Sequence, residues 1–178
     1  MTEPGAIGAT VHRPPSTVYR NMTHIGLDLD ILEELRRDGR ASLRAIAERL
    51  NVSTSTVSQR VKGMEASGVI KGYKPVLDYA KLGYRLTAIT KIKARGVEIP
   101  KIVDELVKEE TLVDVYEITG DYDVLVIGKY PDEESMNREI KRVLAHPEIE
   151  GTNTSIVLSV AKEGGDLDVR AVAGGLEE

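Results

Sequence analysis

The stretch LRAIAERLNVSTSTVSQRVKGMEASGVI, residues 43–70, decides the fold of the N-terminal half of the chain. Apolar residues first recur at the i, i+3, i+4, i+7 spacing of an amphipathic helix, at Leu43, Ile46, Ala47 and Leu50. Asn51 ends this pattern, and asparagine tolerates the left-handed backbone of a tight turn. Ser53 is a natural N-cap for a second helix, because its hydroxyl can accept from a backbone N–H that the helix leaves unpaired.

The second helix has two contrasting faces. Its packing face carries Val57, Val61 and Met64, and Gly68 supplies a C-terminal stop. The polar side chains lie on the opposite face and its flanks: Ser55, Thr56, Ser58, Gln59 and Lys62. Two short helices, the second one polar outside, predict a DNA-binding helix-turn-helix. The alternative is a helical hairpin with a solvated face, but this face lacks the Glu/Lys pairs of a plain surface helix.

The net charge of −5 is unevenly distributed. Residues 1–26 and 27–78 each carry a net charge of +1, whereas residues 79–178 carry −7. Within residues 53–74 the only anion is Glu65, and the cations are Arg60, Lys62, Lys71 and Lys74. This local positive patch coincides with the second helix and favours a nucleic-acid partner. Lys71 and Lys74 either contact phosphates or are simply solvated, and the sequence leaves both open.

The composition excludes several classes of protein. There is no cysteine, so disulfides, thiolate metal sites and cysteine nucleophiles are ruled out. His12, His24 and His146 show no ligand spacing, and we expect no metal and no cofactor. No nucleophile-base pair or phosphate loop supports an enzyme. No apolar run approaches the roughly 20 residues that span a bilayer, and no signal peptide opens the chain, so we expect a cytoplasmic protein without membrane contact.

The chain begins with a segment that has no apolar periodicity. Residues 1–25 mix Gly, Pro, Ser and Thr, and Pro14-Pro15 forbids a helix there. We expect a flexible arm. The alternative gives Arg13 and Arg20 a role in the minor groove of DNA.

A helix and a ribbon flank the central stretch. From Leu27 a helix turns apolar residues inward, with acidic residues near its start and Arg36-Arg37 near its end. The inward residues are Leu29, Ile31, Leu32 and Leu35. This helix closes the core that the helix pair cannot close alone. Residues 71–78 alternate weakly and predict a short extended ribbon, either a small wing or a hinge.

After Gly83, segments in which every second residue is apolar alternate with segments that have the apolar spacing of a helix. This pattern predicts strands over residues 84–94, 112–118, 124–127 and 155–161, and helices over 97–107 and after Asp132. The third strand is apolar throughout, as a strand buried on both faces would be. The last helix is expected to turn four residues inward: Met136, Ile140, Val143 and Leu144. The βαββαβ order predicts a ferredoxin-like domain, and so an α+β chain.

Two helices cover only one face of such a sheet. The bare face must be covered, and we expect a second copy of the chain to cover it. The acidic half is then a dimerisation domain. An operator read by a two-fold dimer follows from this arrangement.

The loop Thr119-Gly120-Asp121-Tyr122-Asp123 joins the second and third strands. A plain hairpin turn would explain Gly120-Asp121. The functional alternative is a ligand loop, because glycine lets a ligand approach the backbone and main-chain N–H groups could hold a carboxylate. Asp121 or Asp123 could then hold an ammonium group. Those are the two charges of an α-amino acid.

The segment LDLDILEELRRDGRASLRAIAERLNVSTSTVSQRVKGMEASGVIKGYKPVLDYAKLGY resembles the N-terminal half of the Lrp/AsnC (feast/famine) regulators. TGDYDVLV and TNTSIVLSVAK resemble their C-terminal effector module. The resemblance covers residues 27–162. Gly63 departs from it, since a helix-favouring cation is common there, at a cost of ~1 kcal/mol in local helix stability. The long arm departs from it as well.

The resemblance implies a transcription factor that binds double-stranded DNA as a homodimer, which assembles further into tetramers or octamers, and that responds to an amino acid. It places the DNA contacts at Ser55, Thr56, Ser58, Gln59 and Arg60, with Lys62 on phosphate. It places the effector contacts at Gly120, Asp121, Tyr122 and Asp123, with Thr154 and Ser155. The alternative is an architectural DNA-binding protein of the same fold without an effector.

We therefore divide the chain into five segments. They are an arm (1–25), a winged-type helix-turn-helix domain (26–72), a hinge or ribbon (73–83), a ferredoxin-like effector-binding and oligomerisation domain (84–164), and a tail (165–178).

Overall fold

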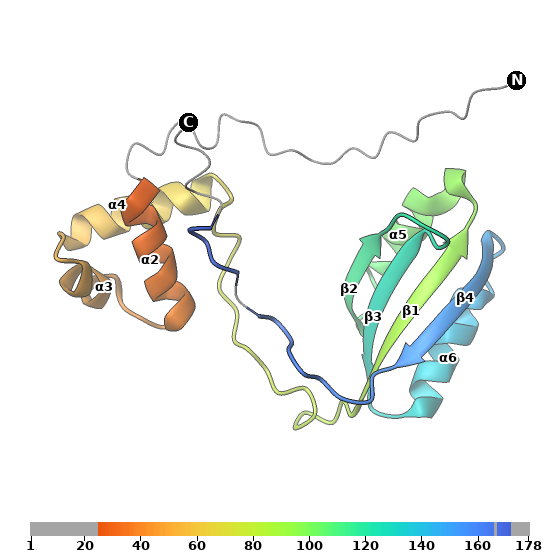
Figure 1. Ribbon diagram of the computed structural model, residues 1–178. Helices are drawn as coiled ribbons and strands as arrows, with labels where there is room; N and C mark the ends of the chain where they lie inside the picture. The colour runs from red at the N-terminus through yellow and green to blue at the C-terminus, as the bar shows by residue number, and fades with distance from the viewer. Residues whose placement is uncertain (1–24, 166, 172–178) are drawn as a thin grey trace, which may run out of the picture. The chain divides into compact units, whose positions relative to one another are not determined.

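The chain forms two compact units in a computed structural model that describes residues 25–165 and 167–171 (Figure 1). Among the described residues, the head comprises 25–75 and 167–171, and the sheet unit spans Val76–Gly165. The predicted arm, with Arg13 and Arg20, lies outside the described residues except for Ile25. Within the described part of the chain, every helix is too short or too polar to span a bilayer.

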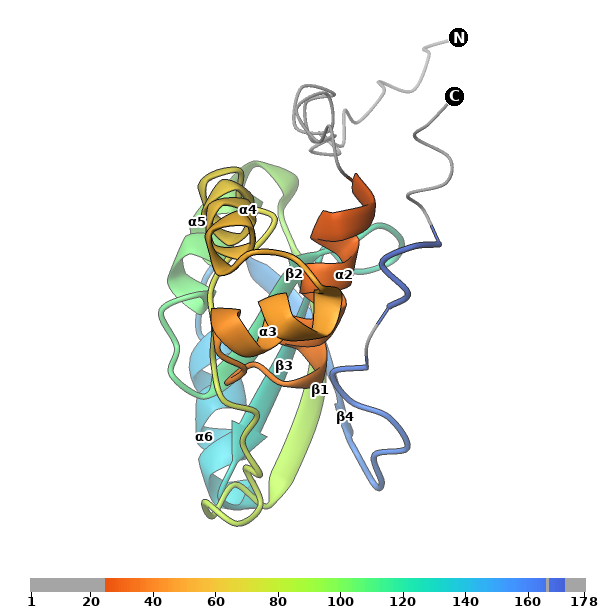
Figure 2. The same cartoon turned by 90° about the vertical axis from the view of Figure 1, so that its left-hand side faces the viewer.

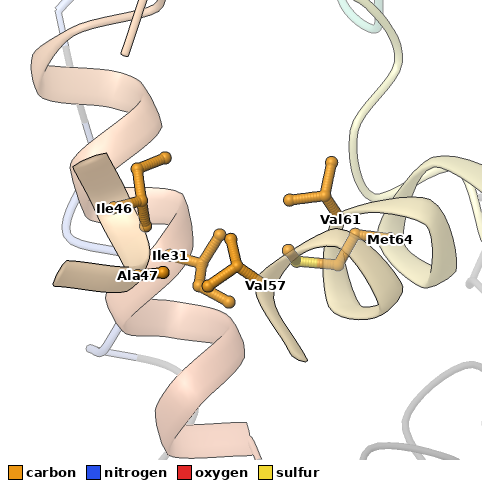
Figure 3. Packing of buried hydrophobic residues seen from close by; sticks show 6 residues of the cluster. All are labelled: Ile31, Ile46, Ala47, Val57, Val61 and Met64. Atoms are coloured by element: carbon orange, nitrogen blue, oxygen red, sulfur yellow. The ribbon is translucent and has the colours of Figure 1, made fainter. Parts of the chain in front are cut away.

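The head is built from α2 (Ile25–Arg37), α3 (Leu43–Leu50) and α4 (Thr54–Ala66). Its core consists of six side chains that are each at most 5% exposed: Ile31, Ile46, Ala47, Val57, Val61 and Met64. Figure 3 shows Ile31 of α2 next to Val57 of α4. The three helices and the packing face of α4 are as the sequence predicts, except that α2 begins at Ile25 and that Leu27 rather than Leu29 packs against this core.

The turn between α3 and α4 has the predicted conformation. Asn51 is left-handed, with φ 53° and ψ 44°, and the N–H of Val52 donates to the carbonyl of Ala47 at 3.0 Å. The Ser53 hydroxyl then caps α4 by accepting from the N–H of Thr56 at 3.0 Å. Since hydrogen bonds fix both ends of the turn, they also fix the angle between α3 and α4.

The ribbon predicted after α4 is irregular chain. Residues 71–78 contain no strand, and the described part of the head offers no second strand with which they could pair. Tyr73 instead donates from its hydroxyl to Glu65 of α4 at 3.1 Å. The boundary between the two units falls within this segment, after Pro75.

The sheet unit has the predicted βαββαβ order. Its strands are β1 (Leu86–Ala94), β2 (Leu112–Glu117), β3 (Val124–Tyr130) and β4 (Ile149–Ile156). They pair antiparallel in the order β2-β3-β1-β4. The helices are α5 (Ile99–Leu106), preceded by the 3-10 turn η1 (Gly96–Glu98), and α6 (Glu133–Leu144). Both lie behind the sheet in Figure 1, and Figure 2 shows them on one side of it.

The expectation that the third strand is buried on both faces is wrong for the single chain. In β3, Val124, Val126 and Gly128 are buried, whereas Leu125 and Ile127 are only partly buried. The buried residues face α5 and α6. The alternating residues lie on the other face, which we call the open face. The apolar run therefore has one face against the core and one apolar face that no described helix of the unit covers.

Other details also differ from the expectation: β1 begins at Leu86 rather than at residue 84, and β3 continues to Tyr130 rather than ending at residue 127. The last strand spans Ile149–Ile156, not residues 155–161, because strand residues must pair with the edge of β1. The N–H of Val157 donates to the carbonyl of Thr87, which is the second residue of β1. The chain after Val157 therefore has almost no β1 left with which to pair. Leu144 is exposed rather than inward, since the buried side of α6 ends with Val143.

Candidate functional site

The exposed side of α4 carries the side chains predicted to meet DNA. Ser55, Gln59 and Lys62 are exposed, and we call these three the reading face. Thr56 and Ser58 are half-buried on its flanks. Burial of the opposite side of α4 in the core leaves this face turned outward, so the structure brings these five predicted residues together on one helix surface.

Hydroxyl groups cluster at the start of α4. The Ser53 hydroxyl lies 2.8 Å from that of Ser55 and 2.7 Å from that of Thr56. The N-terminal end of a helix carries a partial positive charge and attracts anions such as phosphate. Hydroxyl groups at this end can donate to phosphate oxygens or to base edges.

Arg60 does not belong to this surface. Its guanidinium Nη1 lies 3.8 Å from the Oδ2 of Asp28 in α2, and the two side chains are 25% and 5% exposed. The structure therefore places this predicted DNA contact against α2.

A second acid of α2 holds α3. Glu34 is nearly buried, and it forms ion pairs with Arg49 of α3 and, at 3.1 Å, with Arg37. The sequence pattern suggests only dipole pairing near the helix start for these two acids, and Glu34 in fact lies three residues before Arg37, where α2 ends. Their burial could not be seen in that pattern, because it depends on the helices that pack beside them.

The loop after β2 is held by Asp123. Its Oδ2 accepts from the N–H of Ala94 at 2.9 Å, and Lys93 Nζ lies 3.4 Å away. The N–H of Asp123 donates to the carbonyl of Ile92 at 3.0 Å. Asp123 thus ties the loop to the end of β1, and its carboxylate already has partners within the chain.

The remaining loop residues are accessible. Gly120 has φ 116°, a left-handed conformation that residues with a side chain rarely adopt, and both it and Asp121 are exposed. The Tyr122 ring lies 5.9 Å from the Nζ of Lys91. Lys91 lies on the open face of β1, so the loop borders that face.

The two predicted effector residues of β4 lie on opposite faces of the sheet. Thr154 pairs with Thr90, their hydroxyls 3.0 Å apart, on the face that the helices cover. Ser155 pairs with Ile89 on the open face. Since neighbouring strand residues point to opposite sides, a single ligand on the open face meets Ser155 and not Thr154.

The sequence pattern missed two residues near the loop. Asn153 pairs with Lys91 on the open face, and Lys93 contacts Asp123. The partners of Asn153 and Lys93 depend on how β1 pairs with β4 and with β3, and a local sequence pattern does not record this pairing. A cleft between α5 and α6, lined in part by Glu105, Arg142 and His146, includes none of the predicted loop residues.

The open face mixes apolar and charged groups. Ile89 and Ile127 pair across β1 and β3 and are partly buried, and Lys91 pairs with Leu125. Tyr116 of β2 is half exposed, and the negative charge of Asp114 raises the pKa of its phenol.

Two family models match the chain. One, described as winged helix-turn-helix DNA-binding, matches residues 26–71, and the other, described as the Lrp/AsnC ligand binding domain, matches residues 87–167. An uncharacterised HTH-type transcriptional regulator of Pyrococcus abyssi is 45% identical over 137 residues, which cover 77% of this chain and 93% of that protein. The HTH-type transcriptional regulator FL11 of Pyrococcus furiosus is 37% identical, covering 81% and 95%.

Solved structures share the fold. The AsnC structure from E. coli has a TM-score of 0.73 at 25% identity and covers 79% of this chain and 95% of that one. The transcriptional regulator from Neisseria meningitidis in its L-Met complex has a TM-score of 0.71 at 22% identity and covers 78% and 92%.

Replacing Asp123 by Asn should destabilise the sheet unit by about 1–3 kcal/mol, because a charge-assisted hydrogen bond to the Ala94 N–H is weakened. The control Asp121→Asn changes an exposed carboxylate of the same loop. Hydrogen exchange of the Ala94 amide in the full chain measures the effect. Equal protection in the two variants would contradict the anchoring role of Asp123.

Proposed function

Because the chain belongs to the Lrp/AsnC family of DNA-binding transcriptional regulators, we propose that it reads an operator as a homo-oligomer and that a small amino acid changes this binding. The observation that carries the proposal is the polar reading face on a helix whose opposite side is locked in the head core. The role is non-enzymatic, and we place the protein in the cytoplasm.

The reading face supplies the DNA contacts. The Gln59 amide both donates and accepts, which suits a base edge in the major groove, and Lys62 neutralises a phosphate. Ser55, Thr56 and Ser58 supply hydroxyl groups that can serve either partner.

The open face of the sheet supports a homodimer. Ile89, Leu125 and Ile127 expose apolar area there, and burying it against a second copy removes that area from water. Pairing of two chains also brings two heads to one DNA duplex, as a two-fold operator requires. We propose that dimers assemble further into tetramers or octamers.

The loop from Gly120 to Asp123 supports an amino-acid effector bound at the border of the open face. The Gly120 backbone is accessible, Asp121 offers a carboxylate to an ammonium group, and Tyr122 and Lys91 lie on the face that a partner would cover. A ligand that prefers one arrangement of the oligomer shifts the population toward it and so changes how operators are spanned.

The second candidate is an architectural DNA-binding protein without an effector. One observation favours it: the carboxylate of Asp123 is already engaged by Lys93 and Ala94. Under this candidate the loop is a hairpin turn and Asp121 has no ligand.

Gln59→Ala should reduce discrimination between operator and mismatched duplex by about 1–3 kcal/mol, because one base-edge contact is lost. A duplex selected by the wild-type protein from a random library serves as operator in competition gel shifts. Asn137→Ala, which removes an exposed amide of α6, is the matched control. Unchanged discrimination in Gln59→Ala would remove this residue from the interface.

Ile127→Glu should convert the oligomer into monomers, since it places a charge at the centre of the proposed interface. Analytical ultracentrifugation measures the mass, and circular dichroism checks that the variant is folded. Val97→Glu, at a strongly exposed position of η1, is the control. Wild-type mass for Ile127→Glu would argue against the open face as the interface.

Asp121→Ala should abolish the shift in melting temperature that the effector produces, while basal DNA binding is kept. All twenty amino acids are screened first on the wild-type protein. Asp104→Ala, at an exposed position of α5, is the control. A wild-type protein that no amino acid stabilises would favour the architectural candidate, and an unaltered shift in Asp121→Ala would exclude the loop assignment.

A further inference from the structure

Arg60 occupies a packing position of α4 rather than a reading position. Residues 57, 60, 61 and 64 follow the i, i+3, i+4, i+7 spacing of the buried stripe, and Val57, Val61 and Met64 are buried in the head core. Successive residues of a helix are separated by ~100°, so Arg60 points well away from Gln59. Its side chain accordingly lies among the groups that face α2.

The partner of Arg60 is a buried carboxylate. The side chain of Asp28 is 5% exposed, and its Oδ2 lies 3.8 Å from the guanidinium of Arg60. Removing a carboxylate from water is costly unless an opposite charge stands beside it, so Asp28 stabilises the position of Arg60 and is stabilised by it. A guanidinium held in this way cannot also reach a base edge without giving up its contact with Asp28.

A second ion pair between a buried acid of α2 and an arginine occurs in the head. Glu34, the other buried acid of α2, pairs with Arg49 of α3. Each helix of the helix-turn-helix pair is therefore tied to α2 by one arginine. Apolar packing has no direction of its own, whereas an ion pair between two fixed backbones restrains how far a helix can rotate or slide.

We propose that Arg60 is a positioning residue: through Asp28 it sets the rotation of α4 and so the presentation of Ser55, Gln59 and Lys62, and it does not itself contact DNA. This inference rests on the proposed reading of DNA by α4. It predicts that breaking the ion pair lowers specificity although neither partner touches the duplex.

The experiment compares Arg60→Met, Asp28→Asn and the double variant, all in the full chain. Methionine keeps most of the aliphatic stem of Arg60, and asparagine keeps the shape of Asp28. The double variant carries neither charge of this ion pair, so it stays testable if Arg60→Met alone does not fold. Binding to the selected operator and to a mismatched duplex is measured over a range of salt concentrations, well below each melting temperature.

Asp28→Asn should lower the ratio of operator to mismatch affinity by roughly 5- to 10-fold, and the double variant should lose no more than that, because both changes break one interaction. Arg60→Lys keeps the positive charge, so it should retain most of the wild-type ratio of operator to mismatch affinity. The slope of log affinity against log salt should be unchanged in the double variant, whereas Lys62→Met should reduce it by about 0.9, the loss of one phosphate contact.

A salt slope that falls by about 0.9 in the double variant would show that Arg60 contacts phosphate and would overturn the inference. Full operator selectivity in Asp28→Asn would overturn it as well, while leaving the proposed function standing. A wild-type chain that selects no duplex would instead overturn the function itself, and this inference with it.

Discussion

One-sided burial of α4 is the constraint on which the head depends. Val57, Val61 and Met64 enter the core between α2 and α3, and the polar side of the same helix is left in solvent. An eight-residue helix such as α3 is not stable alone in water, so α3 and α4 exist as helices because they bury apolar side chains against α2 and each other. The same packing that folds the head therefore presents the side chains for DNA. A substitution that disturbs the packing of α4 is therefore expected to disturb its polar face as well.

Charge adds direction to this packing. Asp28 and Glu34 are buried on α2, and each meets an arginine from one of the other two helices. The head thus pairs some of its cations with buried acids of α2 and leaves others, such as Lys62, exposed. The net positive charge of the segment does not by itself show which cations pair with acids of α2 and which are exposed.

The sheet unit depends on a different regularity. Alternation along β1 and β3 sends one set of side chains to α5 and α6 and the other to the open face. The helices of the described unit cover only the first set. The apolar residues of the second set, Ile89 and Ile127 among them, are the basis of the proposed contact between chains. The loop tied down by Asp123 borders this face, so a ligand bound there would sense whether a second chain is present.

The sequence by itself determined the elements whose signals are local. The αL turn at Asn51 and the caps at Ser53 and Asp132 follow from residue type, since hydrogen bonds within a few residues enforce them. The order of strands and helices and the reading face follow from the apolar spacing, since that spacing marks which side of each element can be buried. Only the tertiary structure decided where β4 pairs, which face Thr154 takes, and that Arg60 meets Asp28. Those outcomes depend on partners far away in the chain, and neither periodicity nor composition records which distant group will lie within reach.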